Sequence, residues 1–408
     1  MESGDTAWVL ISAALVLFMT PGLAFFYGGM DRSRSVLNML MMNFWCLLSV
    51  PVLWVIVGYS IAGGDVDASW FGGFDAVFLN GIDLSDGGAT LLGVIFVGMF
   101  AVITPALISG AVADRMKFSA WAIFAPLWML LAFAPIFKWV YGGWLGVRGS
   151  LDFAGGTAIH VNAGIAALVA VLILGKRKGW PKEGHPPHSM PLVMIGTGIL
   201  WFGWFGFNAG SALAANGQAV QAFMNTFLAA AAAGLAWAAV ERIKDGHFTN
   251  LGVASGIVAG LVAITPAAGY VTSMPAILIG AAAGVICAFA VHLKFKAGYD
   301  DALDVVGVHL VGGLVGSLMI GLFADPDYFG GDHMKGLFYG GGLNLLLEQV
   351  IANGVAIVWS GAITAGLLLA LKATIGIRVS DEVEESGIDA AEHAETGYNL
   401  GEVTMGRT

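Results

Sequence analysis

Nine long stretches of this sequence contain no Asp, Glu, Lys or Arg, and they restrict the possible folds more than any other feature. A membrane-spanning helix needs roughly 20 predominantly apolar residues, and every stretch is long enough to supply one. Soluble domains carry about a quarter charged residues, whereas 11% of this chain is charged. The sequence therefore predicts an all-α polytopic membrane protein. The stretches are residues 7–30, 35–64, 87–113, 118–137, 153–175, 189–240, 248–293, 305–324 and 349–371.

The two longest stretches each exceed 40 residues and must fold back once. Residues 214–218 and 265–273 hold the Gly, Asn, Pro and Ser residues that allow such a break. The expected total is eleven helices. Because five is an odd number, two five-helix units would enter the membrane from opposite sides, as an inverted repeat with its functional site between the halves. We expect a transmembrane domain over 1–371, with halves at about 7–175 and 189–324 and an eleventh helix at about 345–371, followed by an acidic cytoplasmic tail over 372–408.

The loops differ in positive charge, which predicts the orientation of the chain. Loops after odd-numbered spans contain twelve Lys and Arg residues, and loops after even-numbered spans contain three. Positively charged loops stay in the cytoplasm, so we expect a cell (inner) membrane protein with its N-terminus outside and its C-terminus inside. The acidic start at residues 1–5 does not fit a signal peptide. The net charge of -10 comes largely from the outer loops and the tail, so we expect no nucleic-acid partner.

Two histidines, His160 and His309, lie inside otherwise apolar segments at the fifth and tenth spans. In a soluble core such a histidine is usually a satisfied buried group. Within a membrane, a polar ring is costly and tends to line a pathway or a proton relay. Asp152 and Asp304 precede the two histidines by eight and five residues, which places each pair on different helix faces. We therefore expect Asp152 to cap a helix that begins near Phe153, and the two histidines to be partners across the inverted halves.

Aromatic residues form a second candidate site. Phe96 and Phe100 are one turn apart in the third span, and Trp201, Trp204, Phe205 and Phe207 precede Ser211 in the sixth. These rings have two interpretations, either as ordinary core and lipid-facing surface or as a gate with a cation-π site at a pore mouth. The sequence contains no Ser/His/Asp constellation, Walker loop or clustered metal-ligand spacing, so we expect neither an enzyme nor a cofactor. Metal transport by the two histidines is a minor alternative, since cysteine and carboxylate neighbours are missing at mid-span.

Four segments closely resemble the Amt branch of the Amt/Mep/Rh ammonium transporter family. They are residues 21–29 (PGLAFFYGG), 152–160 (DFAGGTAIH), 204–211 (WFGFNAGS) and 300–309 (DDALDVVGVH). The resemblance covers the whole chain, including eleven spans and the tail. It implies a homotrimer with one pore per subunit, and a PII-type signalling protein as a possible partner at the cytoplasmic face.

The resemblance also implies a role for each matching residue. Phe100 and Phe207 resemble a stacked gate, Ser211 a vestibule hydroxyl, His160 and His309 the pore pair, Asp152 the support of the recruitment site, and Trp204 a tryptophan beside the pore. The family often has a vestibule tryptophan about a dozen residues before the aspartate. Here the segment Lys138–Trp144 is shorter by about one glycine, so either Tyr141 or Trp144 takes that place.

The resemblance predicts a transport mechanism. Ammonium is recruited at the outer vestibule and loses a proton at the gate, and ammonia then passes the histidines, with the proton following so that transport is electrogenic. Two alternatives stay open, namely a neutral ammonia gas channel of the Rh type and an ammonium sensor with little flux.

Overall fold

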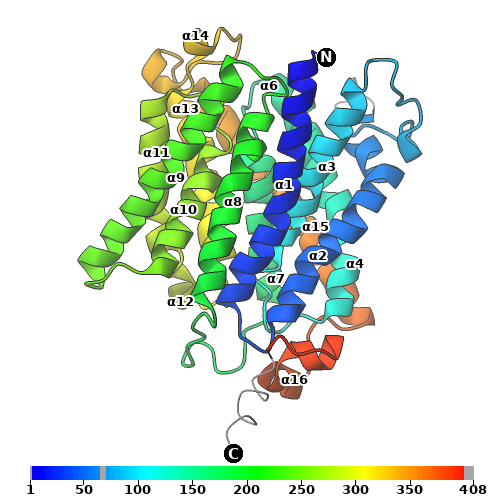
Figure 1. The fold of residues 1–408 in the computed structure, drawn as a ribbon, viewed down its shortest axis with the longest axis vertical. Helices are drawn as coiled ribbons and strands as arrows, with labels where there is room; N and C mark the ends of the chain where they lie inside the picture. The colour runs from blue at the N-terminus through cyan, green and yellow to red at the C-terminus, as the bar shows by residue number, and fades with distance from the viewer. Residues whose placement is uncertain (1, 65–69, 399–408) are drawn as a thin grey trace, which may run out of the picture.

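The computed structural model describes residues 2–64 and 70–398, and in these residues the chain is a bundle of long helices (Figure 1). Within the described ranges no β-strand is assigned, and Met116 and Arg378 form an isolated bridge. Helices satisfy their backbone hydrogen bonds internally, which a chain in a bilayer requires. Figure 1 places the N-terminus at one end of the bundle and the C-terminal segment at the other. We refer to these ends as the N-terminal side and the tail side.

The helix count agrees with the sequence-based prediction of eleven. In the described residues ten helices are long and apolar enough to cross a membrane, and the shorter apolar helix α10 lies between the seventh and eighth of these ten. The spans in chain order are α1 (Ser3–Met30), α2 (Val36–Leu53) with η1 (Trp54–Gly58), α3 (Ala89–Ile108), α4 (Phe118–Trp128) with η4 (Met129–Phe133) and α5 (Ala134–Val140), η5 (Gly156–Val161) with α7 (Asn162–Leu174), α8 (Met190–Gly210), α9 (Gly217–Lys244), α10 (Asn250–Ile264), α11 (Ser273–Ala290) with α12 (Leu293–Ala297), η6 (Val306–Leu310) with α13 (Val311–Phe323), and α15 (Asn344–Thr374).

Short elements lie between these spans. The breaks expected at 214–218 and 265–273 fall between α8 and α9 and between α10 and α11. The second break is not an exposed loop, because Thr265, Ala267, Ala268 and Val271 are all fully buried. Non-helical backbone at membrane depth is tolerated where protein surrounds it. The short elements are η2 (Ser60–Gly64), η3 (Val77–Leu79), α6 (Trp144–Arg148), α14 (Pro326–Phe329), η7 (Leu337–Tyr339), α16 (Asp381–Ser386) and η8 (Asp389–His393).

Glycines allow the helices to pack with their backbones in contact. A Cβ atom added to Gly256 of α10 would lie 2.7 Å from Cβ of Trp237, and one added to Gly260 would lie 2.5 Å from the carbonyl oxygen of Ala229. Small residues at such positions are how helices associate in lipid, where no hydrophobic drive brings them together. The α9–α10 contact therefore excludes larger side chains at both positions.

The described part of the C-terminal tail, residues 372–398, packs against the tail side of the bundle, where α16 lies in Figure 1. The carboxylate of Asp389 accepts hydrogen bonds from the backbone N–H groups of Leu37 (3.0 Å) and Asn38 (2.8 Å), at the N-terminus of α2. The preceding residue, Ser35, makes no capping hydrogen bond of its own. A residue about 350 positions away in the chain therefore supplies the acceptor that a helix N-terminus needs.

Asp389→Ala is expected to loosen both the start of α2 and the tail. Loss of a capping side chain costs about 1 kcal/mol, so amide hydrogen exchange at Leu37 and Asn38 should become several-fold faster. The matched control is Asp381→Ala, because Asp381 is exposed and belongs to the same tail. Equal exchange rates in the two variants would contradict the capping role.

Buried charges join the loops on the tail side. The guanidinium of Arg177 binds Asp300 (2.9 Å) and Asp114 (3.4 Å), and Arg32 binds Asp114 (2.6 Å). Burial acts to raise the pKa of Asp114, but the ion pairs with Arg32 and Arg177 outweigh it and lower that pKa. At Asp31, burial and the neighbouring Asp114 carboxylate instead raise the pKa well above its usual range. Asp31 and Asp114 are therefore shifted in opposite directions although they lie in the same cluster.

Asp31→Asn is expected to stabilise the protein at high pH. Since the pKa of Asp31 is raised on folding, the folded state binds more protons than the unfolded state, and stability falls as pH rises from the unfolded pKa through the folded pKa. Asparagine removes this loss, so the variant should melt above the wild type at about pH 8 and close to it at about pH 4. Thermal unfolding in detergent measures this. Asp114→Asn breaks ion pairs and should lower the melting temperature at pH 8.

Candidate functional site

The two histidines predicted as partners lie in contact at the centre of the bundle. Nδ1 of His309 is 3.3 Å from Nδ1 of His160, and the rings are inclined by 21° with centroids 5.4 Å apart. Both side chains are almost completely buried. Each histidine lies in a π-helical turn, η5 or η6, that opens its span. Such turns are rare and frequently found at functional sites.

The neighbouring hydrogen bonds indicate which ring nitrogens carry protons. The hydroxyl of Tyr27 donates to the carbonyl oxygen of Leu107 (3.1 Å), so its oxygen can only accept from Nε2–H of His309, at a long 3.5 Å. A neutral His309 then accepts at Nδ1 from Nδ1–H of His160. Nε2 of His160 is left with a lone pair and has no partner among the described residues. We infer this tautomer order from the hydrogen-bond pattern.

A stack of aromatic rings leads from the histidines toward the N-terminal side. The ring of His160 is stacked on Trp204 at 5.4 Å and on Phe207 at 6.1 Å. Phe207 in turn lies 4.4 Å from Phe100, with the rings tilted by 39°. Trp204 is fixed by a hydrogen bond from its indole nitrogen to Oγ1 of Thr265 (2.8 Å). The two predicted gate residues are therefore adjacent to each other and to the first histidine.

Beyond the phenylalanines lies a cavity of about 340 Å³ that contains most of the predicted recruitment residues. Phe100, Tyr141, Asp152 and Ser211 line it. The Ser211 hydroxyl donates to the carbonyl oxygen of Phe207 (2.8 Å), which leaves the lone pairs of its oxygen for a donor in the cavity. The other lining residues are Phe96, Val97, Phe137, Phe153, Ala154, Ala212, Leu213, Gln218 and Tyr270.

The structure separates the two candidates for the vestibule aromatic. Tyr141 lines the cavity, whereas Trp144 lines a groove on another flank of the bundle, beside Trp70 and Trp139. Tyr270 is a cavity residue that the sequence-based argument did not identify. It lies in the buried break after α10, with its ring edge-on to Phe153 at 5.5 Å. The sequence signal that could have identified Tyr270 is a polar aromatic residue within the otherwise apolar break at 265–273.

Asp152 caps the helix that carries the first histidine, and it accepts more backbone hydrogen bonds than a single N-cap residue usually does. The helix begins at Gly156 rather than near Phe153. Oδ1 accepts from the backbone N–H groups of Gly155 (2.8 Å) and Gly156 (2.7 Å), and Oδ2 accepts from those of Thr157 (2.9 Å) and Ala158 (3.0 Å). A proton on either oxygen would break a hydrogen bond, so the site holds a carboxylate.

The second half repeats this arrangement with a different aspartate from the one considered in the sequence. Asp301 accepts from the backbone N–H groups of Val305 (3.1 Å) and Val306 (2.7 Å). It precedes His309 by eight residues, as Asp152 precedes His160. Asp304 instead adopts a left-handed conformation (φ 63°) and pairs with Lys294 at 2.6 Å. The counterpart of Asp152 is therefore Asp301.

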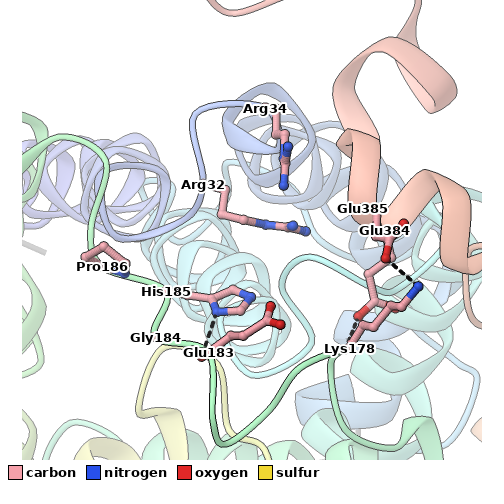
Figure 2. Close-up of a pocket in the computed structure, with 9 residues that line it drawn as sticks. All are labelled: Arg32, Arg34, Lys178, Glu183, Gly184, His185, Pro186, Glu384 and Glu385. Atoms are coloured by element: carbon pink, nitrogen blue, oxygen red, sulfur yellow. Dashed lines mark hydrogen bonds and ion pairs between the residues drawn. The ribbon is translucent and has the colours of Figure 1, made fainter.

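A polar pocket of about 290 Å³ lies on the tail side, far from the histidines in the fold (Figure 2). Figure 2 shows Arg32 and Arg34 on one wall, His185 and Glu183 on another, and Glu384 and Glu385 of α16 facing Lys178. The backbone N–H of Lys178 donates to Glu384 (2.7 Å), and its ammonium group pairs with Glu385. The pocket therefore joins the tail to two loops of the bundle. In the described part of the chain no three His, Cys, Asp or Glu side chains form a metal-binding cluster.

Comparison with known proteins agrees with this geometry. Residues 7–398 match the model of the "Ammonium Transporter Family". The chain is 51% identical to an ammonium transporter of Mycobacterium tuberculosis, over 98% of this chain and 91% of the relative. It is 50% identical to one of Aquifex aeolicus, over 98% and 94%.

Solved structures show the same fold. Candida albicans Mep2 superposes with a TM-score of 0.88 at 32% identity, covering 94% of this chain and 87% of the other. A protein described as "Sensor Amt Protein" superposes with a TM-score of 0.89 at 28% identity, covering 96% and 98%. The family match extends across both histidine helices and into the tail as far as residue 398. The chain belongs to the Ammonium Transporter Family.

Proposed function

We propose that this chain recruits ammonium at the cavity beyond Phe100, removes one proton there, and conducts ammonia past the histidine pair while the proton follows separately. The observation that supports this most is the continuous series of cavity, phenylalanine pair and hydrogen-bonded histidines. We propose a transporter rather than an enzyme, since the chain belongs to a family of ammonium transporters.

Recruitment would use one negative charge and several aromatic faces. The Asp152 carboxylate is 6% exposed and lines the cavity, so it acts on a cation mainly through its charge. Tyr141 and Tyr270 offer ring faces, which attract cations within about 6 Å of the ring centre. The oxygen of Ser211 accepts one ammonium hydrogen. Potassium would gain the charge attraction but makes no hydrogen bond to the serine.

Deprotonation would follow from the cost of entering the apolar segment. Moving an ion without partners from water into a low-dielectric medium has a prohibitive free-energy cost, because the ion loses its hydration. Neutral ammonia carries no charge and avoids this cost. Ammonium can leave its proton behind and potassium cannot. The tautomer order gives the proton a route, because Nε2 of His160 can accept a proton while Nε2–H of His309 releases one to bulk water on the tail side, after which both rings must return to the starting order. Each passage requires a proton to move between the two Nδ1 atoms.

We further propose the arrangement of the chain in the cell. The tail side carries most loop Lys and Arg residues, so it would face the cytoplasm in the inner membrane, with the cavity outside. The matching Asp–His spacing and π-helical turns in the two spans support inverted halves over 7–175 and 189–324, with α15 as the eleventh helix. A homotrimer and a PII-type partner at the tail side complete this proposal.

Reconstitution in liposomes tests it. An inward ammonium gradient should give a transient current, and an equal potassium gradient should give none. Uptake of ammonia without current would favour the gas-channel alternative. High-affinity ammonium binding with negligible flux would favour a sensor, as the name of the structural relative "Sensor Amt Protein" indicates for that protein. Growth of an ammonium-uptake mutant on low ammonium at acidic pH should be restored only by the transporter.

A further inference from the structure

Four polar side chains form a closed hydrogen-bonded network at the turn that carries His160. They come from three separate spans, namely Thr157 of η5, Ser317 of α13, and Gln349 and Asn353 of α15. Each is at most 2% exposed. Because an unpaired polar group is costly inside a membrane, polar residues there are rare and usually functional. The proposed ammonium pathway uses none of these four side chains.

Every side-chain nitrogen and oxygen of the network has a partner. The Thr157 hydroxyl donates to Oδ1 of Asn353 (3.0 Å), and Nδ2 of Asn353 donates to the Ser317 hydroxyl (2.7 Å). The Ser317 oxygen is 3.3 Å from Oγ1 of Thr157, to which it can donate, so the cycle closes. The amide of Gln349 exchanges hydrogen bonds of 2.7 and 2.8 Å with the backbone of Leu151, and its Nε2 also donates to Ser317. Such a fully satisfied network makes its surroundings rigid.

The two histidine spans touch backbone to backbone next to this network. A Cβ atom added to Gly313 of α13 would lie 3.1 Å from Cβ of His160, and one added to Gly164 of α7 would overlap the backbone of Leu310. With no side chains between the spans at these points, a small shift of one span moves one histidine ring relative to the other. Thr157 is three residues before His160 in the same turn, so a shift of Thr157 moves the His160 ring.

In the described residues this support is given to the first histidine span and not to the second. Val306, which has no hydroxyl, is the residue three positions before His309. The eleventh helix also holds the fifth span further along, where the Ser360 hydroxyl donates to the carbonyl oxygen of Asn162 at 2.9 Å. Because α15 lies outside both proposed halves, its polar face adds an asymmetric support to an otherwise repeated pair of spans.

We propose that the network around Asn353 positions the histidine pair. It holds His160 at the distance from His309 at which a proton can move between the two Nδ1 atoms, and this inference rests on the proposed role of the pair. Without the network, η5 is free to shift against α13, and the 3.3 Å contact lengthens. Proton transfer then slows although the recruitment cavity is unchanged. A misplacement of about 1 Å can cost on the order of 100-fold in rate.

Thr157→Val and Thr157→Ser form a matched pair of variants. Valine keeps the shape of threonine but leaves Oδ1 of Asn353 without its donor, whereas serine keeps the hydroxyl. Thr364→Val is the control on the eleventh helix, because Thr364 accepts a hydrogen bond from the indole of Trp128 (2.9 Å) and lies about three turns beyond Asn353. If Thr157→Val does not fold, Thr157→Val combined with Asn353→Leu replaces it, since removing both partners leaves no unpaired group between them.

Solid-state NMR of full-length protein with ¹⁵N-labelled histidine, in liposomes, reports the contact itself. The Nδ1 signals of His160 and His309, assigned with the single alanine variants, should be the same in wild type, Thr157→Ser and Thr364→Val, and shifted in Thr157→Val. The ammonium current of Thr157→Val should fall on the order of 10- to 100-fold. Unchanged Nδ1 signals in Thr157→Val would overturn the proposal, and so would an equal shift in Thr364→Val. Shifted signals with a normal current would support the positioning role and contradict the proton route through the pair.

Discussion

Asp152→Ala is expected to abolish the ammonium current and to destabilise the fifth span. The carboxylate holds four backbone N–H groups at the start of η5, and hydrogen bonds to a charged group contribute about 1.5 to 3 kcal/mol each. Water entering the cavity can replace part of this loss. Even a net loss of about 3 kcal/mol corresponds to roughly 100-fold in an equilibrium constant. Both the melting temperature and the initial current in liposomes should fall.

Asp152→Asn separates the charge from the cap. The amide keeps one acceptor oxygen, for Gly155 and Gly156, but presents donors to Thr157 and Ala158. We expect a smaller drop in melting temperature than for alanine, together with a similar loss of current, because the attraction for the cation is gone in both. A current in the asparagine variant close to that of the wild type would show that Asp152 acts only through the helix. Asp304→Asn, in the other half, controls for the loss of a negative charge.

Replacing both pore histidines by alanine is expected to reduce the ammonium current and to allow a potassium current. Removal of the rings takes away the proton route and leaves a space that water can enter. A positioned proton-transfer group typically contributes at least about 100-fold to a rate, so the current specific to ammonium should fall on that order. A potassium current should appear, because a hydrated ion no longer meets an apolar barrier.

Paired gradients of ammonium and potassium across the same liposomes measure both currents. His185→Ala is the control, since His185 lies in an exposed loop of the tail-side pocket. His160→Ala and His309→Ala alone should each lose the ammonium current, because either change interrupts the Nδ1–Nδ1 contact. Unchanged discrimination against potassium in the double variant would refute the proposed role of the pair.

The number of spans was predictable because charge is nearly absent from the spans and concentrated in the loops. The contact between His160 and His309 followed from placing one histidine in the fifth span and one in the tenth. What the pattern could not provide is local backbone geometry. The start of η5 at Gly156 depends on four N–H groups converging on Asp152, and nothing in residue spacing shows a π-helical turn.

Other features of the site could not be predicted from the sequence because they depend on three-dimensional packing. The sequence indicates Asp152 and Asp304 as corresponding residues because each precedes one of the two pore histidines. The left-handed backbone of Asp304 turns it toward Lys294, and Asp301 takes the capping role instead. Tyr270 was missed because its segment interrupts a long apolar run and so looked like an ordinary connection. Trp144 was a fair candidate by distance along the chain, but α6 places it on the groove.

The buried break after α10 places the cavity within the electric field of the membrane. With 15 residues, α10 rises about 22 Å, short of the roughly 30 Å hydrocarbon core. The backbone N–H of Phe153 then donates to the carbonyl oxygen of Pro266, at 2.9 Å, in this break. A cation that reaches Asp152 has therefore already crossed part of the transmembrane voltage. Since a full crossing is worth about 2.3 kcal/mol per 100 mV, the apparent affinity for ammonium should itself depend on voltage.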